Sequence, residues 1–126
     1  MIREALARLG RPAHDLEKVF GEGKSTTGDD GWRRIVWSQT WFGENVEARY
    51  TFDPSGSLIR IDYSTGDAAK TIASIREELG EPTKEGPAPH FLNSDAIAIW
   101  ERDRLTITLE DYARGCEVGI TANQET

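Results

Sequence analysis

A chain of 126 residues, of which 37% are hydrophobic and 29% charged, suits one domain with a packed core and a well-solvated surface. Its formal net charge of −7 opposes binding to nucleic acid, because neutralising phosphates requires a basic face. The same charge favours a protein partner with a basic surface, and most of it falls in residues 64–126, which hold twelve acidic and six basic side chains.

The first helices are predicted from apolar residues at three- and four-residue spacing. A helix over 2–9 is expected to end at Gly10 and Pro12, because glycine adopts the left-handed conformation that closes a helix and proline cannot continue it. A second short helix is predicted over 14–20, with Asp15 as its cap. The predicted core-facing residues of these helices are Ile2, Ala5, Leu6, Leu9, Leu16, Val19 and Phe20.

A loop and three strands are predicted next. Residues 21–31 contain four glycines and no apolar side chain, which is typical of a loop. From Trp32 the apolar period changes to two, as in strands, and Asp-Pro-Ser-Gly at 53–56 predicts a hairpin turn. The buried face of this antiparallel meander is predicted to hold Ile35, Trp37, Gln39, Trp41, Val46, Ala48, Tyr50, Phe52, Ile59, Ile61 and Tyr63.

The same order of elements returns in the second half. A helix is predicted within 64–80, with Ala68, Ile72, Ile75 and Leu79 on its apolar stripe, Ser64 or Thr65 as its cap and Gly80 at its end. Beyond it we expect a loop and three further strands, over 83–95, 96–102, 105–112 and 116–123.

The repeated order predicts an internal duplication. Leu-Gly-x-Pro occurs at 9–12 and again at 79–82, and Trp37 matches Trp100 in the following strands. We therefore predict an α+β fold in one domain, 1–126. It is built from two similar units, 1–63 and 64–126, each a helix or helix pair followed by a three-stranded antiparallel meander, with one shared core and the helices on one sheet face. Alternatively, the two Leu-Gly-x-Pro segments are unrelated, since glycine and proline are common at the ends of helices.

The chemical motifs argue against an enzyme. The stretch GEGKST at 21–26 resembles a phosphate-binding loop, but Lys18 occupies the place of the required first glycine, and a strand rather than a helix follows. His14 and His90 are too far apart in sequence for a metal-ligand motif. Cys116 shares a strand face with apolar residues, as a core cysteine does, although a Cys116–His90 hydrolase is conceivable. We predict no catalytic residue, cofactor or metal.

Aromatic and charged residues give the candidate binding surface. Trp41 and Phe42 are adjacent, so a strand would point one of them away from the core, beside Arg33 and Arg34. The alternative is that Trp41 or Phe42 closes the end of the core. The full set of partner-binding candidates is Arg33, Arg34, Trp41, Phe42, Asp29, Asp30, Asp95, Glu101 and Asp103.

The order of motifs resembles a known module. A helix ending in Leu-Gly-x-Pro, a glycine-rich loop, a Trp-bearing strand and YTFDPSGSLIRI at 50–61 are similar to the helix-and-meander unit of small outer-membrane assembly lipoproteins and tandem-repeat β-lactamase inhibitor proteins. The resemblance implies two units that form one curved sheet with helices behind it, and a protein-binding use of the fold. The chain differs from both groups because it has no signal segment, lipidated cysteine or disulfide pair.

We expect a non-enzymatic, protein-binding module, and more specifically an immunity or inhibitor protein that neutralises a basic toxin or nuclease. A single cysteine and the absence of a targeting or membrane segment predict a cytoplasmic protein.

Two alternatives remain open. A small-ligand binder or enzyme would use a cleft where loops 21–31 and 83–95 converge, with Lys24, Asp29, Asp30, His90 and Asp95 as its first candidates. A small structural protein would instead form a homodimer by pairing exposed strand edges.

Overall fold

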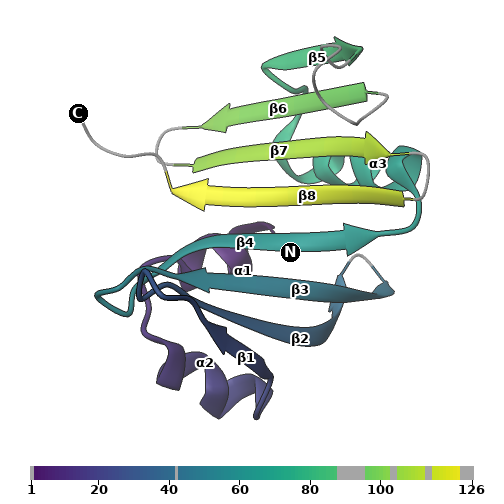
Figure 1. The fold of residues 1–126 in the computed structure, drawn as a ribbon. Coiled ribbons are helices and arrows are strands. Elements are labelled where there is room, and N and C mark those ends of the chain that lie inside the picture. The colour runs from purple at the N-terminus through teal and green to yellow at the C-terminus, as the bar shows by residue number, and fades with distance from the viewer. Residues whose placement is uncertain (1, 42, 88–95, 103–104, 113–114, 123–126) are drawn as a thin grey trace.

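The computed structural model describes residues 2–41, 43–87, 96–102, 105–112 and 115–122. Within them the chain forms an α+β fold of three helices and one eight-stranded antiparallel sheet (Figure 1). In chain order the elements are α1 (Ile2–Arg8), α2 (Ala13–Phe20), β1 (Lys24–Thr27), β2 (Arg33–Trp41), β3 (Glu44–Phe52), β4 (Leu58–Thr65), α3 (Ala68–Leu79), β5 (Lys84–Pro87), β6 (Ala96–Arg102), β7 (Leu105–Tyr112) and β8 (Gly115–Ala122).

The two predicted meanders share one sheet. Its strand order is β1-β2-β3-β4-β8-β7-β6-β5, so the first four strands are neighbours in sequence and the last four return in reverse. The halves meet where β4 pairs with β8, from Arg60 opposite Thr121 to Thr65 opposite Cys116. Antiparallel meanders are thus confirmed, whereas the origin of the two halves from one repeated unit stays a prediction.

The edge strands β1 and β5 lie where the sequence analysis expected only loops. Each has four residues, KSTT and KEGP, and neither alternates apolar and polar side chains. They are held by antiparallel pairing with β2 and β6 through the backbone, which leaves no trace in hydropathy. The loop predictions were therefore wrong for 24–27 and 84–87.

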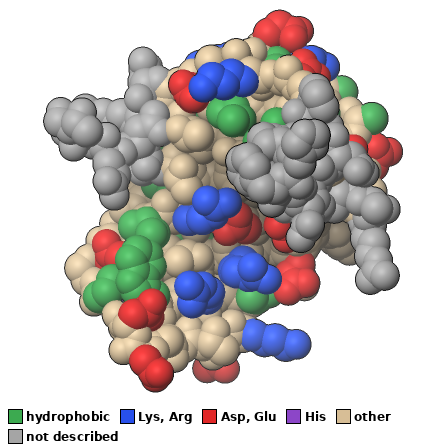
Figure 2. Space-filling model, turned by 45° about the horizontal axis from the view of Figure 1, so that its top comes forward, with side chains coloured by type: hydrophobic (Ala, Val, Ile, Leu, Met, Phe, Trp, Pro, Cys, Tyr) green, Lys and Arg blue, Asp and Glu red, His purple; other side chains and the backbone are tan. Residues whose placement is uncertain are grey.

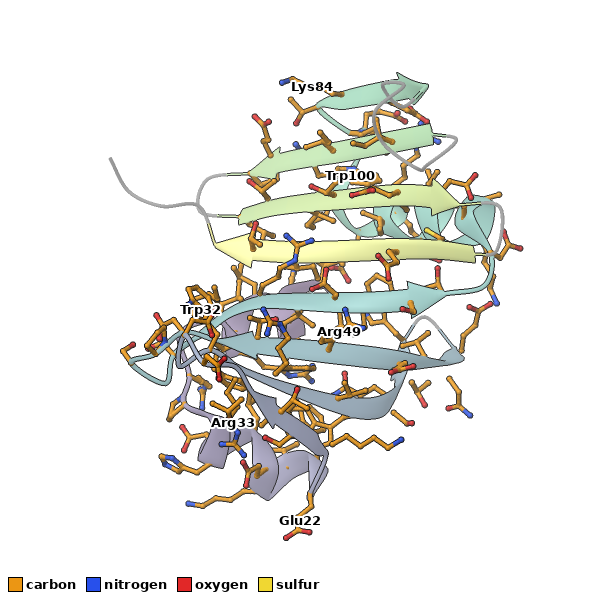
Figure 3. All side chains as sticks on the ribbon, viewed as in Figure 1. Glu22, Trp32, Arg33, Arg49, Lys84 and Trp100 are labelled. Atoms are coloured by element: carbon orange, nitrogen blue, oxygen red, sulfur yellow. The ribbon has the colours of Figure 1, made fainter. Side chains whose placement is uncertain are left out.

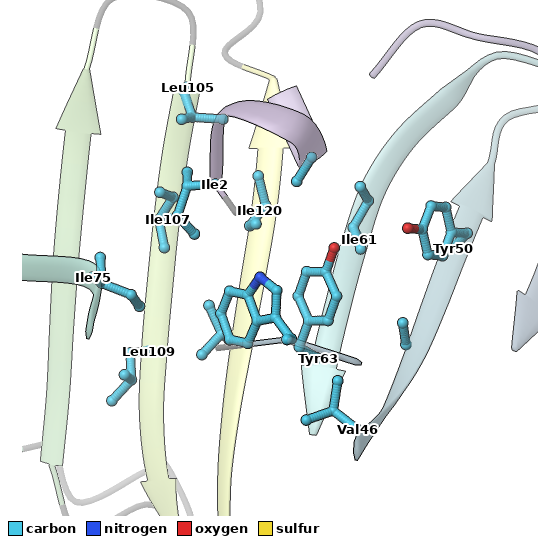
Figure 4. Packing of buried hydrophobic residues seen from close by; sticks show 14 of the residues in the cluster. Ile2, Val46, Tyr50, Ile61, Tyr63, Ile75, Leu105, Ile107, Leu109 and Ile120 are labelled. Atoms are coloured by element: carbon cyan, nitrogen blue, oxygen red, sulfur yellow. The ribbon is translucent and has the colours of Figure 1, made fainter. Parts of the chain in front are cut away.

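The helices cover one face of the sheet and leave the other face open (Figure 1). Buried side chains of the helices pack on inward side chains of the strands in one hydrophobic cluster (Figure 4). Trp37 and Trp100 belong to it, with 4% and 0% of their surface exposed, as predicted. The helical members of the cluster are Ile2, Ala5, Leu16 and Ile75.

A bulge shifts the buried register at the start of β4. The pairing of β3 with β4 changes register between Thr51 and Phe52, which places Phe52 opposite Leu58. Leu58 is consequently buried, and Ile59, predicted to face the core, is only partly buried. Later in the strand Ile61 is buried as predicted.

The short helices α1 and α2 contact the core through a narrower stripe than the sequence analysis expected. Leu6 and Val19 were predicted to face the core, but 42% and 71% of their surface is exposed. The residues that reach the core recur at intervals of three and four, and they are Ile2, Ala5, Leu9, Ala13, Leu16 and Phe20. No helix among the described residues has the length and apolar character needed to span a bilayer.

The caps of the later helices also differ from those predicted. Asp15 lies inside the first turn of α2, whose N-cap is Pro12, without a side-chain cap. The N-cap of α3 is Asp67, whose Oδ1 accepts a 3.1 Å hydrogen bond from the backbone N–H of Lys70, rather than Ser64 or Thr65. Thr65 is instead buried.

The two Leu-Gly-x-Pro segments have different roles. Gly80, with φ 86°, closes α3, and its N–H donates to the carbonyl oxygen of Arg76 at 2.8 Å. Gly10 also has φ 86°, but its N–H donates at 2.8 Å to the carbonyl oxygen of Leu58 in the sheet. The glycine that closes a helix in the first half is Gly21, after α2. Both glycines follow a helix in the left-handed conformation, as predicted, but their N–H groups bond to different partners, so the match between the two segments stays a prediction.

Candidate protein-binding face

The open face of the sheet is formed by the outward side chains of β2, β3, β4, β8, β7 and β6. Side chains alternate along a strand, and residues that are paired across neighbouring strands point to the same side of the sheet. We call a series of paired residues that runs across the sheet from strand to strand a register row. The row through the middle of the face consists of Lys24, Val36, Arg49, Asp62, Gly119, Thr108, Ile99 and Lys84.

Three arginines lie close together on this face, and we call Arg34, Arg49 and Arg60 the arginine cluster. Arg34 and Arg60 both lie opposite Thr51 of β3, one on each side, and Arg49 precedes Thr51 by two residues. Thr51 is only 8% exposed, as expected where arginine stems lie across a small side chain. Figure 2 shows Lys and Arg side chains gathered in the middle of the visible face, and Figure 3 labels Arg49 in front of β3.

Asp62 is the acidic neighbour of the cluster. Its Oδ1 and Oδ2 accept hydrogen bonds of 2.9 and 3.0 Å from Nε of Arg60. Gly119 lies opposite Asp62 in β8, and a Cβ atom there would lie 3.0 Å from Cζ of Arg60 and 3.1 Å from Oδ1 of Asp62. The missing side chain of Gly119 therefore gives the Arg60 guanidinium room to lie across the centre of the sheet.

A second register row of the open face is acidic, and we call Glu47, Glu117 and Glu110 the acidic row. Glu47 of β3 and Glu117 of β8 lie on either side of Ser64, and Glu110 of β7 follows Glu117. Glu47 and Glu117 are exposed. The open face thus carries a cationic part on β2, β3 and β4 and an anionic part on β3, β8 and β7, which gives it an asymmetric charge pattern.

The predicted candidates divide among several places. Arg34 is exposed in the arginine cluster, and Glu101 is exposed on β6, in the same register row as Arg34. Arg33 points the other way: its Nη2 lies 3.1 Å from Oε1 of Glu17, and its Nε donates to Oγ of Ser25 at 2.8 Å. Arg33 therefore holds α2 and β1 to the sheet.

Other candidates do not belong to the open face. Trp41 is 3% exposed and stacks on Tyr63, with ring centroids 4.3 Å apart and planes 4° apart, so the interpretation as a core residue holds. Asp29 and Asp30 are exposed between β1 and β2, where Oδ1 of Asp30 accepts from the backbone N–H of Trp32 at 3.0 Å. The remaining candidates, Phe42, Asp95 and Asp103, lie outside the described residues.

Sequence reasoning missed the rest of the open face. Arg49, Arg60, Glu47 and Glu117 all occupy polar positions of strands that were correctly predicted. Alternation alone placed them on the outward side, but only the pairing of β3 with β4 and of β4 with β8 shows that they are neighbours.

The expected cleft between the two long loops is not formed by their described parts. Strands β1 and β5 lie at opposite edges of the sheet. Seven strand spacings separate them, which corresponds to roughly 30 Å. The prediction that loops 21–31 and 83–95 converge was therefore wrong for residues 21–31 and 83–87. Lys24 and Ser25 also lie in an edge strand, not before a helix, so they form no phosphate-binding loop.

A groove of about 510 Å³ lies near the start of α2. Its walls include Pro12, His14, Phe52 and Pro54, together with the Arg33–Glu17 ion pair. Of the candidates for the predicted cleft that are described, Lys24, Asp29 and Asp30 do not line the groove, although Thr27 and Gly31 of the same segment do. The guanidinium group of Arg33 is already bound to the carboxylate of Glu17, so Arg33 is not available to bind an anionic ligand in the groove.

The nucleophile considered in the sequence is poorly placed for chemistry. Cys116 is 2% exposed, and burial raises the pKa of its thiol, which keeps it protonated and inert near neutral pH. His90, its supposed base, lies outside the described residues. Within the described part of the chain no three His, Cys, Asp or Glu side chains are grouped to hold a metal ion.

Comparisons with known proteins give information on the fold but not on the function. No protein-family model matches the chain. No curated protein matches it either. Among solved structures, the chain is similar to the DUF4309 family protein YjgB from Bacillus subtilis subsp. subtilis str. 168, with a TM-score of 0.57 and 13% sequence identity over 89% of this chain and 78% of that one. At this identity the likeness concerns the arrangement of helices and strands and leaves function to the site.

Proposed function

We propose that this protein is a non-enzymatic protein-binding module that meets its partner with the open face of the sheet. The observation that carries the proposal is the sheet face itself, which the helices leave uncovered and which carries arginines and glutamates on adjacent register rows. Arginine is enriched in protein interfaces, and complementary charge selects a partner and speeds association.

The sheet edges are less suited to binding than the face. Edge strands attract other strands through unpaired backbone groups, and proteins protect them with short length, lysine and proline. Strand β1 has four residues and begins with Lys24, and β5 has four residues, begins with Lys84 and ends with Pro87. We therefore favour a partner on the face over a homodimer formed by strand pairing.

The partner proposed for the acidic row is a protein with basic side chains. Exposed Glu47 and Glu117 would contact them, in line with the net charge of −7. The specific form of this proposal is an immunity or inhibitor protein for a basic toxin or nuclease, acting in a reducing compartment such as the cytoplasm, where the single thiol of Cys116 needs no partner. The protein-binding use implied by the resemblance to inhibitor and assembly modules is part of the same proposal.

The proposal is tested by changing one face at a time. Tagged protein is purified from its native host as the wild type, as the open-face variant Glu47→Lys/Glu117→Lys, and as the control Glu22→Lys/Glu77→Lys. Glu22 and Glu77 are exposed, and lie after α2 and on α3. We expect a stoichiometric protein to be retained by the wild type and the control and lost by the open-face variant. Equal retention by both variants, or no stoichiometric protein with any of them, would contradict the proposal.

A further inference from the structure

We propose that the arginine cluster binds a carboxylate-rich, extended segment of the partner protein. This inference rests on the proposed function, because it assumes that a protein docks on the open face. It goes beyond it by assigning an acidic contact to a protein whose net charge of −7 would by itself predict only basic ones.

The cluster holds cationic charge that the described residues do not neutralise. Arg60 is paired with Asp62, but Arg34 and Arg49 make no side-chain hydrogen bond or ion pair with any other described residue. Arg49 lies on a strand diagonal from both Arg34 and Arg60. Asp62 lies directly opposite Arg49 and is paired with Arg60, so a single carboxylate faces these guanidinium groups, and the three arginines keep an excess of positive charge that an anion can cover.

The spacing of the cluster fits an extended peptide. Diagonal neighbours on adjacent strands lie about 7–8 Å apart, which is the separation of Arg49 from each of the other two arginines. Side chains at every second residue of an extended chain point the same way and are spaced by about 7 Å. Two carboxylates at alternate positions of a partner segment therefore match Arg34 and Arg49, and each guanidinium can donate two parallel hydrogen bonds to one carboxylate.

Gly119 lets the arginine cluster extend toward β8. Glycine within a central strand lowers sheet stability, and it commonly marks a place where another group approaches the backbone closely. Here that group is the guanidinium of Arg60, which occupies the space of the missing side chain. The cluster therefore reaches from β2 across β3 and β4 to β8.

The surroundings of the cluster favour a carboxylate segment over a nucleic acid. Glu47 lies on the same strand as Arg49, Glu117 lies on β8 beside the strand of Arg60, and Glu101 lies farther along the row of Arg34. A long phosphate backbone crossing this face would meet these acidic side chains, which repel it. A protein surface can place its acidic residues on the cluster and basic residues on the acidic row.

The test uses the full-length protein labelled with ¹⁵N and a peptide of eight residues that alternates Glu and Thr. At low ionic strength, we expect saturable amide shifts around Arg34, Arg49 and Arg60. Exposed ion pairs are individually weak, so we expect Arg49→Glu to raise the dissociation constant at least about fivefold. The matched control Arg3→Glu, on exposed Arg3 of α1, is expected to leave it unchanged.

Several results would overturn this inference. The first is an absence of saturable shifts at the cluster, or an equal effect of Arg49→Glu and Arg3→Glu. The second is equally tight binding of an eight-residue oligothymidylate to the same residues, which would indicate a nucleic acid. The third is a dimer in sedimentation of the free protein that Arg49→Glu dissociates, which would mean that a second copy covers the cluster. If Arg49→Glu weakens binding of the peptide but the partner protein is still retained, the cluster does not contact the partner, so this inference is rejected and the proposed function stands.

Discussion

The indole Nε1 of Trp100 donates a 3.0 Å hydrogen bond to the carbonyl oxygen of Gly80, the residue that closes α3. The same contact occurs in the first half of the chain, where Nε1 of Trp37 donates at 3.0 Å to the carbonyl oxygen of Gly21 after α2. Each tryptophan thus connects the sheet to the end of the helix that covers it. A buried indole N–H without such an acceptor would be costly, so the two indoles position the helix ends as well as fill the core.

Replacing either indole should loosen the helix layer. We expect Trp37→Phe and Trp100→Phe each to lower the free energy of unfolding by about 1–3 kcal/mol, through the lost hydrogen bond and the space left behind. The half-exposed Trp32 provides the control, and Trp32→Phe should change stability by less than about 0.5 kcal/mol. Urea denaturation checks this, and equal losses in all three variants would contradict the role of the indole hydrogen bonds.

Trp41 is buried, whereas Arg34 of the same strand is exposed on the open face, so substitutions at the two residues should affect stability differently. Trp41→Ala removes a stacked core residue and should cost about 3–5 kcal/mol of unfolding free energy. Arg34→Ala, in the arginine cluster, should change it by less than about 0.5 kcal/mol. Thermal and urea denaturation of both variants measure the difference. A mild effect of Trp41→Ala would mean that this residue is available to a partner after all.

The hairpin at Asp53 should make stability depend on pH. Hydrogen bonds from the side chain of Ser55 and from backbone N–H groups, chiefly that of Ser57, hold the pKa of the Asp53 carboxyl below its ordinary value of 3.8. Because the folded-state pKa is depressed, the stabilisation is present above the unfolded-state pKa and is lost as pH falls through the folded-state pKa. We expect the stability advantage of the wild type over Asp53→Asn to be constant near neutral pH and to shrink below about pH 4. Denaturation curves between pH 7 and pH 2 measure it, and a pH-independent advantage would contradict this origin.

A substitution at Gly119 should weaken peptide binding without lowering the stability of the fold. Gly119→Ala displaces the flexible end of Arg60 while replacing a strand glycine, so stability should be unchanged or rise by up to about 1 kcal/mol. Binding of the alternating Glu-Thr peptide should weaken about twofold, because Arg60 moves from its place. Urea denaturation and NMR titration on the same sample give both values. A clear loss of stability would show that the Arg60 side chain is fixed by the fold and has no role prepared for a ligand.

The sequence predicted those parts of the fold that hydrophobic periodicity determines. The alternation in β2 and β3 correctly identified their buried residues, and α3 was found with its correct end, although its cap was placed two or three residues too early. Strands β1 and β5 escaped prediction because backbone pairing alone holds them to the sheet. Leu58 was missed because a bulge changes the alternation, and no local pattern reveals which residue a bulge will bury.

The candidate site was predictable only in part, for a different reason. Arg34 was identified because it neighbours aromatic residues in sequence, whereas Arg49 and Arg60 become its neighbours only through strand pairing. Trp41 was expected to face either the surface or the core, and its stacking on Tyr63 of β4 decided for the core. Contacts between strands distant in sequence thus decide which polar residues form a surface, and a single sequence does not contain that register.

The central claim is that another protein covers the open face of the sheet. Carboxyl footprinting of the purified complex tests it most directly, by comparing carbodiimide labelling of exposed glutamates in the free and bound protein. Glu47 and Glu117 lie on the open face, and Glu22 and Glu77 lie after α2 and on α3. We predict that labelling of Glu47 and Glu117 falls on binding while that of Glu22 and Glu77 stays constant. Protection of Glu22 and Glu77 with unchanged labelling of Glu47 and Glu117 would contradict the account.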